Sequence, residues 1–116
     1  RESAKIVLKK IQEIAGSIPV VCTGDFNAEP TAEPVMVIMD KTNPLHLTDS
    51  KEISKTPHYG PTGTFNAFQS KEVNASPIDY IFLKGKWKVW QHATLSQTWE
   101  GRFASDHFAV FAKIEL

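Results

Sequence analysis

The chain has 116 residues, 41% hydrophobic and 22% charged, a balance typical of one globular domain and unlike disordered or collagen-like chains. Its 13 basic residues offset 13 acidic ones, so no strong field attracts nucleic acid, and a nucleic-acid partner stays open without being indicated by charge. A single cysteine, Cys22, excludes a disulfide framework, and with neither a signal-peptide core nor an apolar stretch near the ~18 residues of a membrane span we expect a soluble chain of unassigned compartment.

The chain begins with the pattern of an amphipathic helix. Apolar residues recur at spacings of three and four from Ala4 to Ile14, and Gly16 is expected to end the helix. The next apolar run, residues 19–23, is short, β-branched and unalternating, as expected of a strand covered on both faces. A helix followed by a buried strand is typical of α/β proteins.

A second helix is predicted over residues 32–40. Thr31 can cap it, and Pro34 falls in the first turn, where proline is tolerated. Residues 41–76 are rich in turn-forming residues, so we expect mostly loop with short extended pieces there.

Three strands are predicted in the last third of the chain. They cover residues 78–83, 87–96 and 107–116, and a tight turn at residues 84–86 joins the first two into a hairpin. No repeat, low-complexity tract or linker interrupts the pattern, so we treat residues 1–116 as a single domain.

The first candidate site follows the strand predicted at residues 19–23. Asp25 can hold a water or act as a base, Asn27 can donate to a phosphate oxygen, and Gly24 lets the backbone approach closely. Open α/β sheets place ligands where such strands end. An Asp/Asn turn after a strand explains the same residues about as well.

Two further acidic residues and a histidine lie next to predicted strands. Asp106 and His107 precede the last strand, and Asp79 begins an earlier one, where it needs a partner among apolar neighbours. A carboxylate that fixes the tautomer of a histidine is common in catalytic sites, which favours pairing Asp79 with His107. Structural roles for the histidine and a local backbone cap for Asp79 remain as alternatives.

Three motifs in this order resemble the endonuclease/exonuclease/phosphatase (DNase I-like) family. They are Gly-Asp-Phe-Asn at 24–27, Ile-Asp-Tyr at 78–80 and Ser-Asp-His at 105–107, and residues 60–65 look like a Gly-Thr-aromatic segment of bacterial members. The resemblance covers nearly the whole chain. It implies an α/β (α+β) fold that is half of a four-layer α/β sandwich, with a mainly antiparallel sheet and about two helices.

The resemblance also implies an activity and a role for each residue. It implies a phosphoesterase that depends on Mg²⁺ or Mn²⁺ and hydrolyses phosphodiesters or phosphomonoesters by in-line attack of water. Asp25 and Asn27 would position the water and the phosphate, and Asp79 would orient His107 against the phosphoryl group. Asp106, with Asp25, would bind or neighbour the metal.

The chain departs from the family pattern at its beginning. Family members carry an Asn, a metal-binding Glu and a further catalytic His or Tyr upstream of the first helix, and the sequence begins after that point. We therefore expect a C-terminal, partial domain whose sheet needs the missing N-terminal half or a second copy of the chain. The alternative is a non-catalytic fragment, or a binding-only relative, that assembles through its uncovered sheet face.

Other residues give weaker indications. Asn66, Trp99 and Arg102 are possible substrate contacts near the predicted site, whereas His46 and His92 are single histidines better explained by packing or surface roles. The shared site of the family serves many phosphate esters, and the neutral charge of the chain favours small or lipid-like ones.

Overall fold

The structure is a computed structural model that describes residues 2–66, 76–96, 98, 102 and 105–116. These residues form two helices and five strands. In chain order the elements are α1 (Glu2–Ala15), β1 (Val20–Asp25), α2 (Glu33–Ile38), β2 (Thr48–Asp49), β3 (Asp79–Lys84), β4 (Lys88–Leu95) and β5 (Ala109–Glu115). The predicted α/β class with two helices and mainly antiparallel strands is confirmed.

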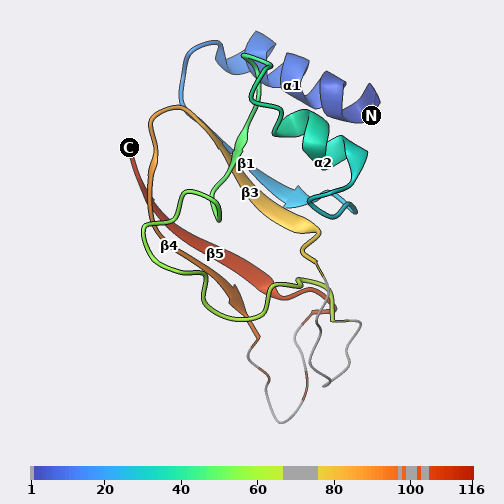
Figure 1. The fold of residues 1–116 in the computed structure, drawn as a ribbon, viewed down its shortest axis with the longest axis vertical. Coiled ribbons are helices and arrows are strands. Elements are labelled where there is room, and N and C mark those ends of the chain that lie inside the picture. Colours follow the sequence, from blue (N-terminus) through green and yellow to red (C-terminus); the bar gives the residue numbers. More distant parts are fainter. Residues whose placement is uncertain (1, 67–75, 97, 99–101, 103–104) are drawn as a thin grey trace.

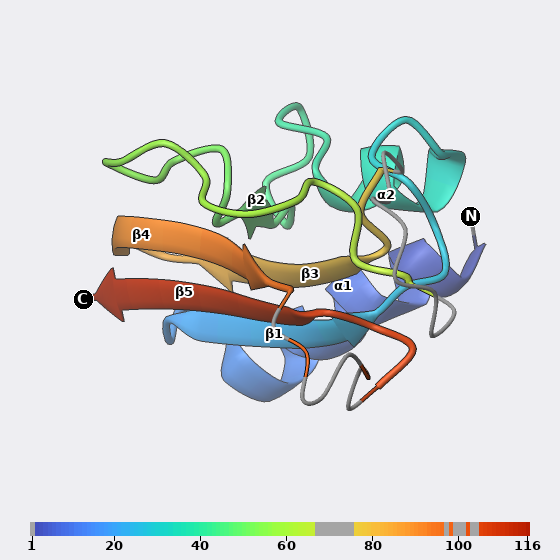
Figure 2. The ribbon, with the colours of Figure 1, turned by 90° about the horizontal axis from the view of Figure 1, so that it is seen from below.

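The elements stack in layers. A three-stranded antiparallel sheet has the order β1-β3-β2, and β4 and β5 form a separate antiparallel pair. Figure 1 shows both helices on one side of the three-stranded sheet and the β4-β5 sheet on the other. Figure 2, seen along the perpendicular direction, shows the two sheets one behind the other. In the described residues no helix has the length and apolar character that crossing a membrane requires.

One face of α1 packs against the hydrophobic core. Ala4 and Leu8 are buried and pack in one cluster with α2 and with Tyr80 and Phe82 of β3. Gly16 ends the helix as predicted, with φ of 57° in the region that glycine adopts without a Cβ penalty. Ile14, predicted on the apolar face, is 83% exposed, so the contact with the core is lost before the last turn of the helix.

β1 is not the doubly covered strand that its sequence predicts. Cys22 packs against the helical core, and partial burial raises the pKa of its thiol. Val21, on the opposite face, is 43% exposed, although its partner Leu83 on β3 is only 2% exposed. The β4-β5 sheet therefore covers β3 and leaves β1 partly uncovered. A short apolar run predicts a strand but does not tell how many of its faces are covered.

Two local predictions are wrong in an informative way. β3 and β4 do not form a hairpin, because the turn at Gly85 carries the chain from one sheet to the other. α2 starts later than predicted, with Ala32 at its N-cap and no side-chain cap, so Thr31 does not cap it. Pro34 does lie in the first turn, as expected.

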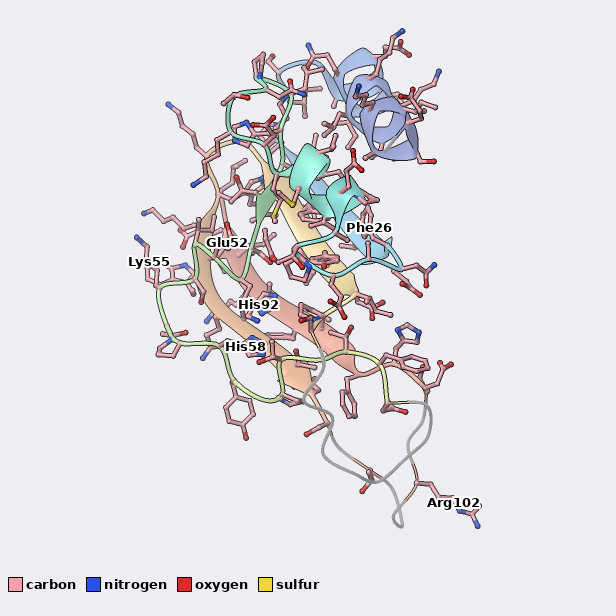
Figure 3. The ribbon with its side chains drawn as sticks, turned by 45° about the vertical axis from the view of Figure 1, so that its right-hand side comes forward. Phe26, Glu52, Lys55, His58, His92 and Arg102 are labelled. Atoms are coloured by element: carbon pink, nitrogen blue, oxygen red, sulfur yellow. The ribbon has the colours of Figure 1, made fainter. Side chains whose placement is uncertain are left out.

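The segment before Phe65 runs beside β4, and its half-buried His58 contacts the buried His92 of β4. Tyr59 N–H donates to the carbonyl of His92 at 3.0 Å, and Thr94 N–H donates back to Tyr59 at 2.9 Å. The Nδ1 atoms of His58 and His92 lie 2.9 Å apart, and Figure 3 shows the two labelled side chains side by side. Burial, with the nearby His58 and Lys51, lowers the pKa of His92 to about 4. A packing role for His92 agrees with these contacts.

Gly60 is the position where this arrangement tolerates no side chain. Its φ is +91°, and an added Cβ would collide with the backbone carbonyl of Thr94. Gly16 also has positive φ, but its surroundings are open. We expect Gly60→Ala to lower the free energy of unfolding by roughly 2–5 kcal/mol and Gly16→Ala by about 1–2 kcal/mol. Urea unfolding midpoints measure both, and equal losses would show that the contact with Thr94 is not close.

Candidate functional site

Two carboxylates stand opposite each other at the end of the β1-β3 pair. The last cross-strand pair in the register is Asp25 with Asp79. Directly opposed residues of antiparallel strands project from the same face of a sheet, and like charges in such a pair repel each other. The same face carries Leu83 and receives the β4-β5 sheet, so a positive group from that sheet can reach both acids.

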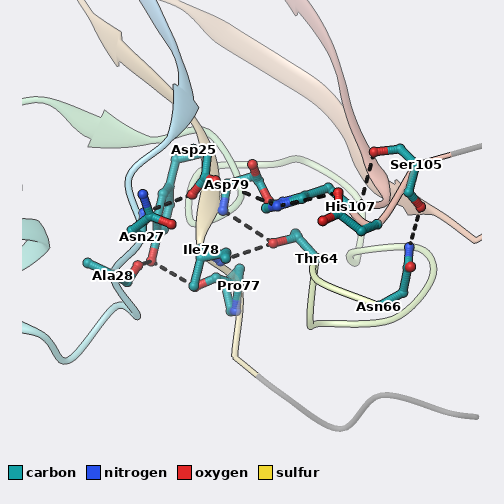
Figure 4. A network of polar contacts seen from close by, with 12 residues as sticks. Asp25, Asn27, Ala28, Thr64, Asn66, Pro77, Ile78, Asp79, Ser105 and His107 are labelled. Atoms are coloured by element: carbon teal, nitrogen blue, oxygen red, sulfur yellow. Dashed lines mark hydrogen bonds and ion pairs between the residues drawn. The ribbon is translucent and has the colours of Figure 1, made fainter. Parts of the chain in front are cut away.

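The group that reaches both acids is His107, two residues before β5 begins at Ala109. Its Nδ1 lies 2.7 Å from Oδ2 of Asp79, and its Nε2 lies 3.6 Å from Oδ2 of Asp25. Figure 4 shows the His107 ring beside Asp79, with the dashed contact between them, and Asp25 close by at the end of β1. The predicted contact between Asp79 and His107 is confirmed. Because Nδ1–H donates to Asp79, Nε2 is the nitrogen that faces Asp25.

The hydrogen bond to Asp79 is the main cause that raises the pKa of His107 above its ordinary value. Partial burial acts in the opposite direction, and the charges of Asp79, Asp25 and Asp106 add to the rise. The charged pair therefore stabilises the fold fully below about pH 6.5, the ordinary histidine pKa, and this contribution is lost as the pH rises through the raised value.

Asp106 lies on the outer side of this arrangement. Its Oδ1 is 4.0 Å from Nε2 of His107, and its side chain is 46% exposed. Ser105 Oγ accepts a hydrogen bond from the backbone N–H of His107 at 3.1 Å, which holds the turn that carries both residues. The structure thus brings Asp106 to the same nitrogen that faces Asp25.

Asn27 occupies the turn that follows β1. Its backbone N–H donates to Oδ1 of Asp25 at 2.8 Å, and its φ of 50° is left-handed. The Asp/Asn turn weighed from the sequence is therefore present, and it leaves Asn27 exposed at the rim of the site. A structural turn and a phosphate-binding amide are compatible at this position, because the turn uses only backbone and Asp25 atoms.

Sequence reasoning missed the tyrosine that supports this turn. Tyr80 is 3% exposed, and its hydroxyl lies 2.6 Å from the carbonyl of Ala28 and 3.0 Å from that of Pro77. Phe26 meets the Tyr80 ring edge to face, with centroids 5.8 Å apart. The Ile-Asp-Tyr motif therefore has two separate functions: Asp79 binds His107, and Tyr80 ties down the loop that carries Asn27.

The three expected substrate contacts differ in where they lie. Asn66 is 2% exposed, and its amide donates to the carbonyl of Ser105 at 3.0 Å, so it lies inside the protein and binds the backbone beside the site. Arg102 is exposed and lies at the far end of the molecule in Figure 3. Trp99 lies outside the described residues. Phe65 reaches the site instead, with its ring edge-on to His107 at 5.3 Å.

The carboxylates of the site are oxygen ligands of the kind that bind a hard divalent cation. Among the described residues, ligand atoms of Asp25, Asp79 and His107 lie within 4.8 Å of one another. Asp79 and His107 already bind each other, so Asp25 and the neighbouring Asp106 are the acids with free approach from solvent. Carboxylate oxygens are the ligands that Mg²⁺ and Mn²⁺ prefer, and Mg²⁺ completes its shell with water and substrate phosphate. The donor set fits such an ion.

The electrostatics of the site predict a graded response to loss of each acid. Asp79→Asn should lower the pKa of His107 most, because it removes the hydrogen-bonded charge, whereas Asp25→Asn removes only a charge 3.6 Å away. Titration of the histidine ring protons by NMR, in the presence of a chelator, measures both shifts, and His107→Gln assigns the signal. A larger shift in Asp25→Asn than in Asp79→Asn would contradict the assigned cause.

The arrangement matches known proteins in sequence and in structure. The sequence profile of the Endonuclease/Exonuclease/phosphatase family matches residues 6–107. No curated protein sequence matches the chain. A mannosyl-6-phosphatase from Bacteroides thetaiotaomicron is similar in structure, with 31% identity and a TM-score of 0.87 over 99% of this chain and 45% of its own.

Two further solved structures are similar. An endonuclease/exonuclease/phosphatase family protein from the same organism has 32% identity and a TM-score of 0.87, over 97% of this chain and 42% of its own. A conserved protein of unknown function from Enterococcus faecalis V583 has 36% identity and a TM-score of 0.80, over 96% of this chain and 42% of its own. The chain thus spans less than half the length of these relatives, and the expected family fold, present in part, is confirmed. It belongs to the Endonuclease/Exonuclease/phosphatase family.

Proposed function

We propose that the protein containing this chain is a divalent-metal-dependent phosphoesterase. The observation that carries the proposal is the 2.7 Å contact between His107 and Asp79, which turns Nε2 toward Asp25 and Asp106. The contact with Asp79 raises the pKa of His107 and so favours the imidazolium, the form in which Nε2 can donate a proton or hydrogen bond. Carboxylates on the other side of the same nitrogen can accept a proton from water.

Each residue then has a distinct task in hydrolysis. Asp25 accepts a hydrogen bond from the attacking water and takes up its proton, because its carboxylate is 37% exposed and lies 3.6 Å from Nε2 of His107. His107 donates from Nε2 to a phosphoryl oxygen, and Asp79 keeps the donor aligned. Asn27 offers its side-chain amide to a second phosphate oxygen from the exposed turn.

Asp25 and Asp106 would hold the metal. When bound, Mg²⁺ or Mn²⁺ supplies charge neutralisation at the phosphate and helps to orient it. The few protein oxygens at this position leave room for water and for ligands from residues outside the chain.

A small phosphate monoester is the substrate class that we favour. One relative with 31% identity is described as a mannosyl-6-phosphatase, which acts on a sugar phosphate. The net charge of zero gives this chain no general attraction for a polyanion such as nucleic acid. Both observations favour a small molecule over DNA or RNA.

Paired substitutions in the full-length protein test the proposed roles. Asp25→Asn and His107→Gln should each lower turnover of a phosphomonoester with Mg²⁺ or Mn²⁺ by about 10²–10⁴-fold, because each removes a proton-transfer or charge-stabilising group. Matched controls are Glu13→Gln, in an exposed pair on α1, and His46→Gln, whose Nδ1 contacts the Asn43 carbonyl.

The controls should leave turnover unchanged, and a chelator should abolish it in every active variant. Turnover that survives both site substitutions, or that persists after complete removal of metal, would sink the proposal.

A second candidate function is assembly without catalysis by this portion of the protein. Its basis is the outer face of the β4-β5 sheet, where Leu95 and Phe111 share a face by register and are 40% and 44% exposed. Exposed apolar side chains on a sheet mark a surface that a partner can cover. The candidate partners are the rest of a longer protein and a second copy of the chain.

Self-association of the 116-residue chain tests this candidate. Light scattering should show a mass that grows with concentration, and Phe111→Asp should reduce the growth because it places a charge on the outer sheet face. Ile14→Asp, at a position 83% exposed on α1, is the matched control and should have no effect. A folded chain that stays monomeric at all concentrations would contradict self-association.

A further inference from the structure

Thr64 lies behind the candidate site and is almost completely buried, with 1% of its surface exposed. Its Oγ1 accepts hydrogen bonds from the backbone N–H groups of Ile78 at 3.0 Å and Asp79 at 3.2 Å. A hydroxyl oxygen has two acceptor lone pairs, so one side chain can serve both donors. Figure 4 shows Thr64 between the start of β3 and the approach to β5.

The backbone of the same segment binds the other half of the site. The Thr64 carbonyl accepts from the N–H of Phe108 at 2.6 Å, and Phe65 and His107 form an antiparallel bridge. Asn66 N–H donates to the carbonyl of Asp106 at 2.7 Å. Thr64 is therefore joined to Asp79 by its side chain and to the residue after His107 by its backbone.

These contacts fix the separation of the two backbones that carry the acid and the histidine. Asp79 belongs to the three-stranded sheet, whereas His107 leads into the β4-β5 sheet. β3 and β5 are not paired with each other, so no strand ladder holds the two residues together. Without the hydroxyl, the backbone amides of Ile78 and Asp79 lose their acceptor. Water replaces it poorly, because the position of Thr64 is buried.

We infer that Thr64 is a positioning residue for the Asp79–His107 pair. It touches neither substrate nor reacting atoms, and acts by holding the start of β3 at the spacing that a 2.7 Å contact requires. The expected effect of Thr64 on turnover rests on the proposed function. Its expected effect on the contact between Asp79 and His107 rests on the hydrogen bonds alone.

The test compares four substitutions in the full-length protein. Thr64→Val keeps the shape and removes the acceptor, whereas Thr64→Ser keeps the acceptor and removes the methyl group. Thr62→Val makes the same change at an exposed position two residues away. If Thr64→Val does not fold, Thr64→Ala replaces it, since alanine differs from the serine variant only by the hydroxyl.

We expect Thr64→Val to lower kcat about 10- to 100-fold with KM changed less than about threefold, because a misplaced catalytic group costs rate rather than binding. Thr64→Ser and Thr62→Val should stay within about threefold of the parent protein in kcat. A full kcat in Thr64→Val, or an equal loss in Thr64→Ser, would overturn the inference.

An activity-free measurement separates this inference from the proposed function. In NMR spectra the proton on His107 Nδ1 should give a protected signal in the parent protein and in Thr64→Ser, and lose protection in Thr64→Val. The amide of Asp79 should exchange with deuterium faster in the same variant. If no variant hydrolyses phosphate esters but these signals respond as expected, the positioning role stands and the proposed activity fails; unchanged signals in Thr64→Val overturn the positioning role.

Discussion

Repulsion between two paired carboxylates is the constraint on which the site depends. Asp25 and Asp79 face each other at the end of adjacent strands, and their backbones cannot separate without breaking the register of the pair. A positive group close to both relieves the repulsion, and the protonated form of His107 provides one from the segment that leads into the other sheet. The same requirement explains why the histidine binds protons more tightly than usual and why a cation is a natural additional partner.

The layers of the fold make this meeting of charges possible. β3 is the central strand, with Phe82 buried toward the helices and Leu83 buried toward the second sheet, so its first residue, Asp79, starts from a firmly held backbone. β1 is less covered, and its end opens into the exposed turn at Asn27. The acid that orients the histidine is thus the less exposed of the two, with 18% of its side chain exposed against 37% for Asp25, while the groups proposed to meet water and phosphate lie at the surface.

The sequence predicts those parts of the site that depend on residues close together along the chain. Asp25, Asp79 and His107 were identifiable because each stands beside an apolar strand, and strand ends of such sheets are where polar groups converge. Thr64 and Tyr80 stand in motifs that the sequence shows, but their roles could not be predicted, because each hydroxyl acts through bonds to residues 14 and 52 positions away and no periodic pattern records such bonds. The predicted hairpin of β3 and β4 was wrong for a similar reason. A tight turn in the sequence predicts where the chain reverses, but it does not predict which strand the following strand pairs with.

One further consequence follows from the division of the site between two sheets. Asp25 and Asp79 stand on one sheet and His107 leads into the other, so a slide of about 1 Å between the layers stretches the 2.7 Å contact between Asp79 and His107 beyond the range of a hydrogen bond. Strands can keep their own ladders during such a slide. We therefore expect mild heating or low denaturant to separate Asp79 from His107 while the backbone of each sheet remains folded, so the alignment of the layers is lost before the layers themselves.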